Sequence, residues 1–164
     1  MKLLVAGVGN VFLGDDGFGV EVVRRMAGTP LPAGVRVADF GIRGVHLAYE
    51  LMDGYDRLIL VDAVQRGDPP GTVSVIEPVS PEAGEPVLDA HDLTPEAVLA
   101  AAGRLGGELG WIRLVGCEPA CLDEGIGLSG PVEAAIDGAV RLVRELLADA
   151  AREDAAVERT GRHA

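Results

Sequence analysis

Short aliphatic runs alternate with segments of helical periodicity along most of this chain, and this alternation limits its fold more than any other feature. The runs are short and continuous, as in strands buried on both faces, and lie at residues 2–8, 35–40, 57–62, 72–77 and 111–117. Apolar residues recur at helical spacing between and after them, at residues 18–27, 45–52, 94–105 and 129–147. This order predicts an α/β fold with a mostly parallel sheet that helices cover on both faces.

The length of the chain limits the number of domains. A chain of 164 residues fits one domain with a substantial core, which we expect to span residues 1–148. Aromatic residues make up only 4% of the chain, so this core must be aliphatic. Residues 149–164 are polar and rich in alanine and mixed charges, and we expect them to form a frayed or disordered tail.

Charge and cysteine content exclude several classes of partner and compartment. The net charge of −12 disfavours nucleic acid, because an acidic surface repels a phosphate backbone. The two cysteines, Cys117 and Cys121, are too few for a disulfide scaffold, which favours a reducing compartment. Glycine interrupts the first apolar run too early for a signal peptide, and no stretch is long enough to span a membrane. We therefore expect a cytoplasmic protein without membrane insertion.

Acidic residues follow or end two of the predicted strands. Asp16 comes after the first strand, and Asp62 ends the strand at residues 57–62. The carboxyl ends of parallel strands meet at one edge of the sheet, where α/β proteins bind their ligands. Asp62 taken alone would be interpreted as a turn-capping acid. Its place at this edge, together with Asp16, instead favours a functional site.

The glycine-rich loop Gly7–Gly19 allows a nucleotide-binding interpretation, which its details disfavour. Gly7-Val8-Gly9 begins like the dinucleotide fingerprint, but Phe12 stands where its third glycine is required. Asp15 and Asp16 lie where a pyrophosphate would dock and would repel it. One acid of the pair is expected to complement the dipole of the following helix, which leaves the second, for which we favour Asp16, as a candidate ligand or base.

A histidine is the third candidate group. His91 precedes a predicted helix, although it could also be a solvated loop residue paired with Asp89 or Asp92. His46 has Glu50 four residues on and is expected to form an exposed helix pair with it. Two carboxylates and one imidazole suit a divalent ion such as nickel, zinc or manganese. The spacing in the sequence does not by itself bring these groups together.

Nucleophile mechanisms have little support in this sequence. Cys117 and Cys121 are separated by three residues instead of the two of a redox motif, and no second cysteine pair completes a zinc site. The chain has no Gly-x-Ser-x-Gly elbow, and Ser129 is better placed to cap a helix.

The loop sequence and several later segments resemble one known family. Gly7-Val8-Gly9-Asn10-Val11-Phe12-Leu13-Gly14-Asp15-Asp16-Gly17-Phe18-Gly19 closely resembles the N-terminal motif of the hydrogenase maturation endopeptidases, which process the large subunit of nickel–iron hydrogenases. Matching segments follow in order over about residues 1–148: Leu60-Val61-Asp62-Ala63-Val64, Pro70-Gly71-Thr72-Val73, His91-Asp92-Leu93, Leu114-Val115-Gly116-Cys117-Glu118-Pro119 and Gly127-Leu128-Ser129-Gly130-Pro131-Val132-Glu133-Ala134-Ala135. Such a series is far more specific than the loop alone.

The resemblance implies a fold, a reaction and a site. The fold would be a three-layer α/β/α sandwich, phosphorylase/hydrolase-like, with a twisted, mostly parallel five-stranded sheet. The reaction would remove a C-terminal extension from the hydrogenase large-subunit precursor after nickel insertion, with nickel carried by the precursor and no organic cofactor. The family's metal-contacting and catalytic residues fall on Asp16, Asp62 and His91. The first of these is often glutamate in the family, and Asp16 is one methylene shorter. We expect a monomer.

One segment departs from the family pattern. The family usually has Gly-Gly-Thr-x-Gly after the second strand, where this chain has Phe40-Gly41-Ile42-Arg43-Gly44. We infer a different substrate subgroup and expect substrate contacts from Asn10, Gly41, Arg43 and Gly44. Arg43 would pair with Asp16 or with a carboxylate of the precursor. Two alternatives remain open: a related peptidase with another precursor, and a non-catalytic chaperone that checks the precursor for nickel.

Overall fold

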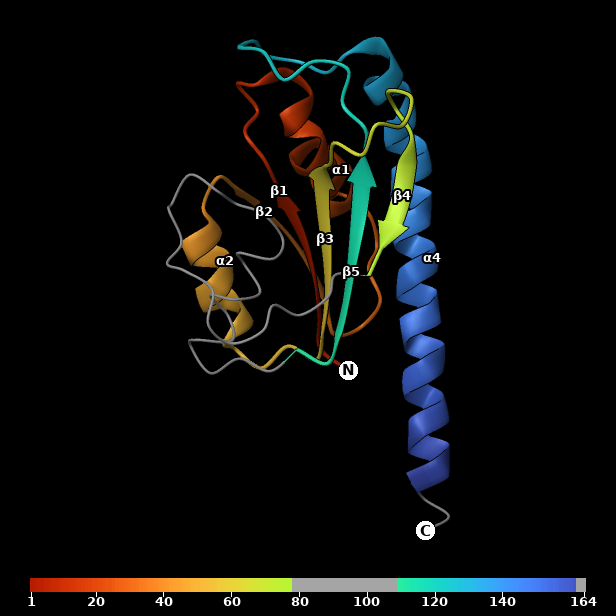
Figure 1. Cartoon of the computed structure of the whole chain (residues 1–164). Helices are drawn as coiled ribbons and strands as arrows, with labels where there is room; N and C mark the ends of the chain where they lie inside the picture. Colours follow the sequence, from red (N-terminus) through yellow and green to blue (C-terminus); the bar gives the residue numbers. More distant parts are fainter. Residues whose placement is uncertain (78–108, 162–164) are drawn as a thin grey trace.

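The computed structural model describes residues 1–77 and 109–161, and this part of the chain contains one five-stranded sheet. The strands are β1 (Leu3–Val8), β2 (Val35–Gly41), β3 (Arg57–Ala63), β4 (Val73–Ile76) and β5 (Trp111–Cys117), in the order β2-β1-β3-β5-β4 (Figure 1). All neighbours pair in parallel except β4, which runs antiparallel to β5 at one edge. The predicted α/β fold with a mostly parallel five-stranded sheet is confirmed.

Helices cover both faces of this sheet and create two apolar cores. One core joins α1 (Phe18–Ala27) and α4 (Gly130–Gly161) to β1, β3 and β5, and the other joins α2 (Gly44–Leu51) to the opposite face (Figure 1). Because side chains alternate along a strand, Leu3 and Val5 enter the first core while Leu4 and Ala6 enter the second. The helix predicted at residues 94–105 lies outside the described residues.

Helix α4 is longer than its sequence suggested. We expected the last helix to end near Leu147 and a frayed tail to follow, whereas α4 continues to Gly161. Contacts with the body of the protein explain the extension: Ala150 is fully buried, Glu153 binds the Arg57 guanidinium at 2.7 Å, and Asp154 lies 3.3 Å from the N-terminal amine. Alanine also favours the helix intrinsically. None of the described helices has the length and apolar character needed to cross a membrane.

The segment between β1 and α1 brings acidic residues to the carboxyl edge of the sheet. After β1 the chain turns through a single 3-10 helix, η1 (Gly14–Gly17), and then enters α1 directly. Gly7 is paired with Val61 in the sheet, so β1 and β3 end side by side. This edge carries the candidate site.

Candidate functional site

Asp16 and Asp62 lie at this edge on neighbouring elements. Asp62 is the penultimate residue of β3 and only 8% of it is exposed. Its Oδ1 accepts a hydrogen bond of 2.8 Å from the Ala63 backbone N–H. Asp16 belongs to η1 and is partly exposed, and its Oδ2 accepts a hydrogen bond of 2.7 Å from the Asn10 N–H. One carboxylate is therefore held from a buried strand and the other from the loop above it.

Glycines in the loop permit this close approach. Gly9 has a φ of +130°, and a Cβ there would lie 1.9 Å from the Asp16 carbonyl oxygen and 3.6 Å from Asp62 Oδ1. Gly19, at the start of α1, would place a Cβ 1.9 Å from the Val61 carbonyl oxygen. Both positions need a residue without a side chain because backbone packs directly on them. The glycine motif thus has a role in bringing Asp16 over Asp62.

The electrostatics of Asp62 differ from those of an isolated acid. The pKa of Asp62 is raised well above its usual value of 3.8, chiefly because burial disfavours the charged form and also because of the negative charge of Asp16. The hydrogen bond from Ala63 opposes this shift only in part. A buried carboxyl beside a second one can hold a proton, act as a base or ligate a cation that neutralises both.

A third metal ligand is not found within residues 1–77 and 109–161. No group of three or more His, Cys, Asp or Glu side chains there could hold a metal ion. The predicted third ligand, His91, lies outside the described residues. The predicted proximity of Asp16 and Asp62 is seen, whereas the role of each and the participation of His91 stay predictions.

Asp15 has a role that the sequence did not indicate. We expected one acid of the pair to complement the dipole of the following helix, and both acids lie in the first turn of η1, although neither η1 nor α1 has a side-chain cap. Asp15 is instead almost completely buried. It accepts hydrogen bonds from the N–H groups of Ala120, Cys121 and Ser129 at 2.8, 3.0 and 2.7 Å and from the Ser129 hydroxyl at 2.8 Å. The Ser129 hydroxyl thus binds Asp15 where we expected it to cap α4.

The hydrogen bonds to Asp15 also control its ionisation. Burial alone would raise the pKa of Asp15, but the bonds from Ser129, Cys121 and Ala120 outweigh that effect and lower the pKa below 3.8. A carboxylate that accepts several N–H bonds is strongly stabilised as the anion. Asp15 is therefore a charged anchor between the η1 loop and the loop at residues 118–129.

Backbone contacts join the same two loops. The Gly14 N–H donates to the Gly125 carbonyl at 3.0 Å, and the Gly125 N–H donates to the Phe12 carbonyl at 2.8 Å. The Asp15 N–H donates to the Cys121 carbonyl at 2.9 Å. The loop that carries Asp16 is consequently held in place both by backbone hydrogen bonds and by the buried Asp15 carboxylate.

The segment that departs from the family pattern touches the site through its backbone. The Gly9 N–H donates to the Gly41 carbonyl at 2.9 Å, and Gly44 begins α2 as a buried residue. We expected Arg43 to pair with Asp16 or with a carboxylate of the precursor, and the first of these pairs is not formed. Its guanidinium folds back on the end of β2 and donates to the carbonyls of Asp39 at 2.9 Å and Phe40 at 3.3 Å, which leaves it exposed.

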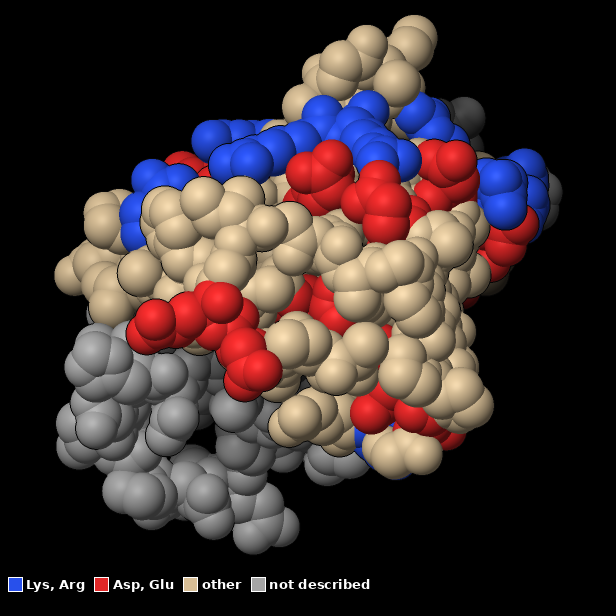
Figure 2. Space-filling model, turned by 90° about the horizontal axis from the view of Figure 1, so that it is seen from above, with Lys and Arg blue, Asp and Glu red and all other residues tan. Residues whose placement is uncertain are grey.

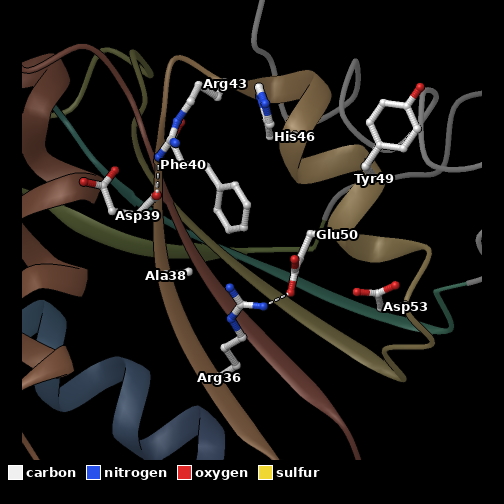
Figure 3. Close-up of a pocket in the computed structure, with 9 residues that line it drawn as sticks. All are labelled: Arg36, Ala38, Asp39, Phe40, Arg43, His46, Tyr49, Glu50 and Asp53. Atoms are coloured by element: carbon white, nitrogen blue, oxygen red, sulfur yellow. Dashed lines mark hydrogen bonds and ion pairs between the residues drawn. The ribbon is translucent and has the colours of Figure 1, made fainter.

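A hollow of about 570 Å³ lies between β2 and α2, beside this segment (Figure 3). Arg36 of β2 pairs with Glu50 of α2 across it, and Glu50 also accepts a hydrogen bond of 2.6 Å from the Tyr55 hydroxyl. The helix pair expected between His46 and Glu50 is therefore replaced by contacts from other elements. His46 lies at the wall of the hollow.

Figure 2 shows the molecule from above, looking onto the carboxyl ends of the parallel strands. Acidic side chains lie near the centre of this face and toward its borders, and Lys and Arg side chains gather mainly along one border. The centre of the face onto which the parallel strands end thus shows acidic side chains and no Lys or Arg among the described residues.

Comparison with known proteins decides the family. A sequence model of the family described as hydrogenase maturation protease matches residues 20–146, which is most of the chain. The chain belongs to this family. The Hydrogenase 2 maturation protease of Escherichia coli is 33% identical over 160 residues, covering 93% of this chain and 94% of that protein. The hydrogenase expression/formation protein HupD of Rhizobium leguminosarum is 34% identical over 151 residues, covering 87% of this chain and 74% of its own.

Solved structures of hydrogenase maturation proteases have the same fold. The hydrogenase maturating endopeptidase HybD of Escherichia coli superposes with a TM-score of 0.73 at 29% identity, covering 92% of this chain and 94% of that one. A hydrogenase 2 maturation peptidase from a Thaumarchaeota archaeon gives a TM-score of 0.68 at 34% identity, covering 90% and 99%. The resemblance in the sequence motifs is confirmed, and the chain is an enzyme of a family that hydrolyses peptide bonds.

Proposed function

We propose that this protease removes a C-terminal extension from the large-subunit precursor of a nickel–iron hydrogenase once nickel has been inserted. The observation that carries the proposal is the pair formed by Asp16 and Asp62, which Gly9 allows to share the carboxyl edge of the sheet. Two carboxylates at an accessible edge, one of them buried, can bind a divalent cation brought by the substrate. Membership of the hydrogenase maturation protease family supports this substrate.

In the mechanism that we propose, nickel held by the precursor meets Asp16, Asp62 and His91. This contact tests whether the metal is present and holds the scissile bond near the edge of the sheet. Water then attacks the peptide carbonyl, helped by the metal that polarises this carbonyl or by a carboxylate that acts as general base. The raised pKa of Asp62 supports the second route, because a buried carboxylate takes up a proton more readily than an isolated one.

The decisive experiment incubates the protein with a full-length precursor in nickel-loaded and nickel-free form and measures the intact mass of the products. We expect the loaded precursor alone to lose a C-terminal peptide. Asp16→Ala, Asp62→Ala and His91→Ala should each abolish the cleavage while the circular dichroism spectrum stays that of a folded chain. Asp68→Ala, which alters an exposed acid on the loop after β3, is the matched control and should cleave normally.

The outcomes separate the reaction from the site. An unchanged mass of the nickel-loaded precursor would refute the proposed reaction. Cleavage at the rate of the unmodified protein in all three alanine variants would refute the site and leave the reaction standing. Cleavage of nickel-free precursor would show that no metal check takes place.

Compartment and assembly are part of the same proposal. We propose that the protein acts in the cytoplasm, as a monomer in contact with its precursor. Both cysteines are free thiols, with Cys117 buried and Cys121 exposed, which suits a reducing compartment. Substrate contacts by Asn10, Gly41, Arg43 and Gly44 are also proposed. The Asn10 N–H binds Asp16 and the Gly41 carbonyl accepts from Gly9, and Arg43 and Gly44 follow Gly41 closely in the chain.

A further inference from the structure

Three large apolar side chains stand out from the loops that frame the candidate site. Phe12 is 62% exposed, Leu122 36% and Ile126 83%. We call these three residues the apolar rim. Exposed apolar side chains that gather in one place usually mark an interaction surface, because leaving them in water costs free energy.

The apolar rim is built on a braced backbone. Gly125, which lies between Leu122 and Ile126 in the chain, donates to the Phe12 carbonyl and accepts from the Gly14 N–H. The buried Asp15 carboxylate ties Cys121 and Ser129 to the same loop. A surface that is already held in place loses little conformational entropy when a partner binds, so such a rim is suited to docking.

The two loops that carry the apolar rim have only negatively charged side chains. Residues 9–23 and 114–140, which include both loops, contain no lysine or arginine. The acids of the two loops are Asp15, Asp16, Glu118, Asp123 and Glu124, whereas Glu21, Glu133 and Asp137 on the adjoining helices pair with Arg25. An apolar patch in an acidic border complements an apolar patch bordered by lysine and arginine, and such complementarity speeds and orients association.

The apolar rim is continuous with the site carboxylates. The Phe12 N–H donates to the Asn10 side-chain oxygen at 2.9 Å, and the Asn10 N–H donates to the Asp16 carboxylate. A partner seated on the rim is therefore directly beside Asp16.

We propose that Phe12, Leu122 and Ile126 form the docking surface for the folded body of the hydrogenase large-subunit precursor, which contacts them with an apolar patch bordered by basic residues. This inference rests on the proposed function. The rim binds the body of the precursor, while the carboxylates meet its metal and its scissile bond. Docking would then supply affinity without changing the chemical step.

The test compares Phe12→Asp and Ile126→Asp with Val157→Asp, which places the same charge on an equally exposed apolar position near the far end of α4, where Val157 is 70% exposed. Affinity for nickel-loaded full-length precursor is measured by interferometry, separately from cleavage. We expect each rim variant to weaken binding about tenfold or more and to raise KM with kcat unchanged, and Val157→Asp to bind normally. Unchanged melting temperatures of the rim variants show that the fold is intact.

A charge-reversal arm tests the partner's chemistry. The double variant Asp123→Lys, Glu124→Lys should slow association markedly at low salt and lose most of its effect at high salt. Association of this double variant at the normal rate would refute the proposal that basic residues border the partner's apolar patch.

Two further results would overturn the docking surface. One is that both rim variants bind the precursor with normal affinity and have a normal KM, while the unmodified protein cleaves the precursor. The proposed function would then stand without this inference. The other concerns the oligomeric state. If the unmodified chain sediments as a dimer, and Ile126→Asp makes it a monomer without changing its affinity for the precursor, then a second copy of the chain covers the rim instead of the precursor. Failure of the unmodified protein to cleave the precursor refutes the proposed function instead, and the binding assay still reports on the rim.

Discussion

Replacing Asp15 by asparagine tests whether this buried acid anchors the loops around the site. One carboxylate oxygen of Asp15 accepts the Ser129 N–H, and the other accepts the N–H groups of Ala120 and Cys121 and the Ser129 hydroxyl. In its better orientation the amide oxygen of asparagine keeps these last three bonds. Its NH₂ group then faces the Ser129 N–H, and the negative charge is lost.

The cost can be worked out from these bonds. One buried N–H left without an acceptor costs about 1–3 kcal/mol, and three charge-assisted bonds become neutral ones. With some relaxation of the loops we expect Asp15→Asn to lower the free energy of unfolding by about 2–4 kcal/mol. That corresponds to a fall in melting temperature of roughly 4–16 °C for a chain of this size. Ser129→Ala removes only the hydroxyl bond and should cost about 1–2 kcal/mol.

Urea unfolding followed by circular dichroism measures these losses, with Asp68→Asn as the control at an exposed acid. The expected order of destabilisation is Asp15→Asn, then Ser129→Ala, then Asp68→Asn within about 0.5 kcal/mol of the unmodified chain. Equal stability of Asp15→Asn and the unmodified protein would refute the anchoring role.

The pH dependence gives an independent check on the same residue. The pKa of Asp15 is lower in the folded chain than its usual value of 3.8, so its contribution to stability is present above that value and is lost as the pH falls toward the folded pKa. The difference in stability between the unmodified chain and Asp15→Asn should therefore be constant near neutrality and shrink below about pH 4. A difference that stays constant in acid would contradict the lowered pKa.

Three other changes have definite expected outcomes. Asp62→Asn should abolish cleavage and raise the melting temperature at neutral pH. Because the pKa of Asp62 is higher in the folded chain than its usual value, ionisation of Asp62 destabilises the fold, and asparagine cannot ionise. Gly9→Ala should lower the free energy of unfolding by more than about 1 kcal/mol and stop cleavage, because a Cβ there meets the Asp16 carbonyl and φ is positive. Deleting residues 149–164 should cost about 1–3 kcal/mol, because it removes buried Ala150 and the Glu153 partner of Arg57.

Each of these changes has a control that separates the stated cause from a general effect. Asp62→Asn should lose its advantage in stability as the pH falls below the folded pKa, and an advantage that persists in acid would exclude ionisation as the cause. Gly28→Ala, where a Cβ meets nothing within 4 Å, should leave cleavage normal, and equal behaviour of the two glycine variants would contradict the steric argument. Deleting only residues 158–164 keeps the α4 contacts and should change stability by less than about 0.5 kcal/mol.

Contacts that the sequence pattern does not reveal explain the expectations that were wrong. Asp15 binds groups 105 to 114 residues away, and its neighbour Asp16 carries the same local signals, so the sequence alone could not assign their different roles. Glu50 was expected to pair within its helix, but Arg36 and Tyr55 reach it from β2 and from the segment after α2. Arg43 binds the end of its own preceding strand instead of Asp16 because the turn after β2 directs its guanidinium there.

Local physical chemistry by itself determined the layers and the edge where the candidate site lies. Continuous aliphatic runs between helical segments are typical of strands buried on both faces, and parallel strands bring the loops at their carboxyl ends to one edge of the sheet. The amino-acid sequence alone was therefore enough to place Asp16 and Asp62 together. Only the tertiary structure decided which of two adjacent aspartates is an anchor, how far α4 extends and where apolar side chains remain exposed. Those outcomes depend on contacts between distant segments, and such contacts leave no periodic signal in the sequence.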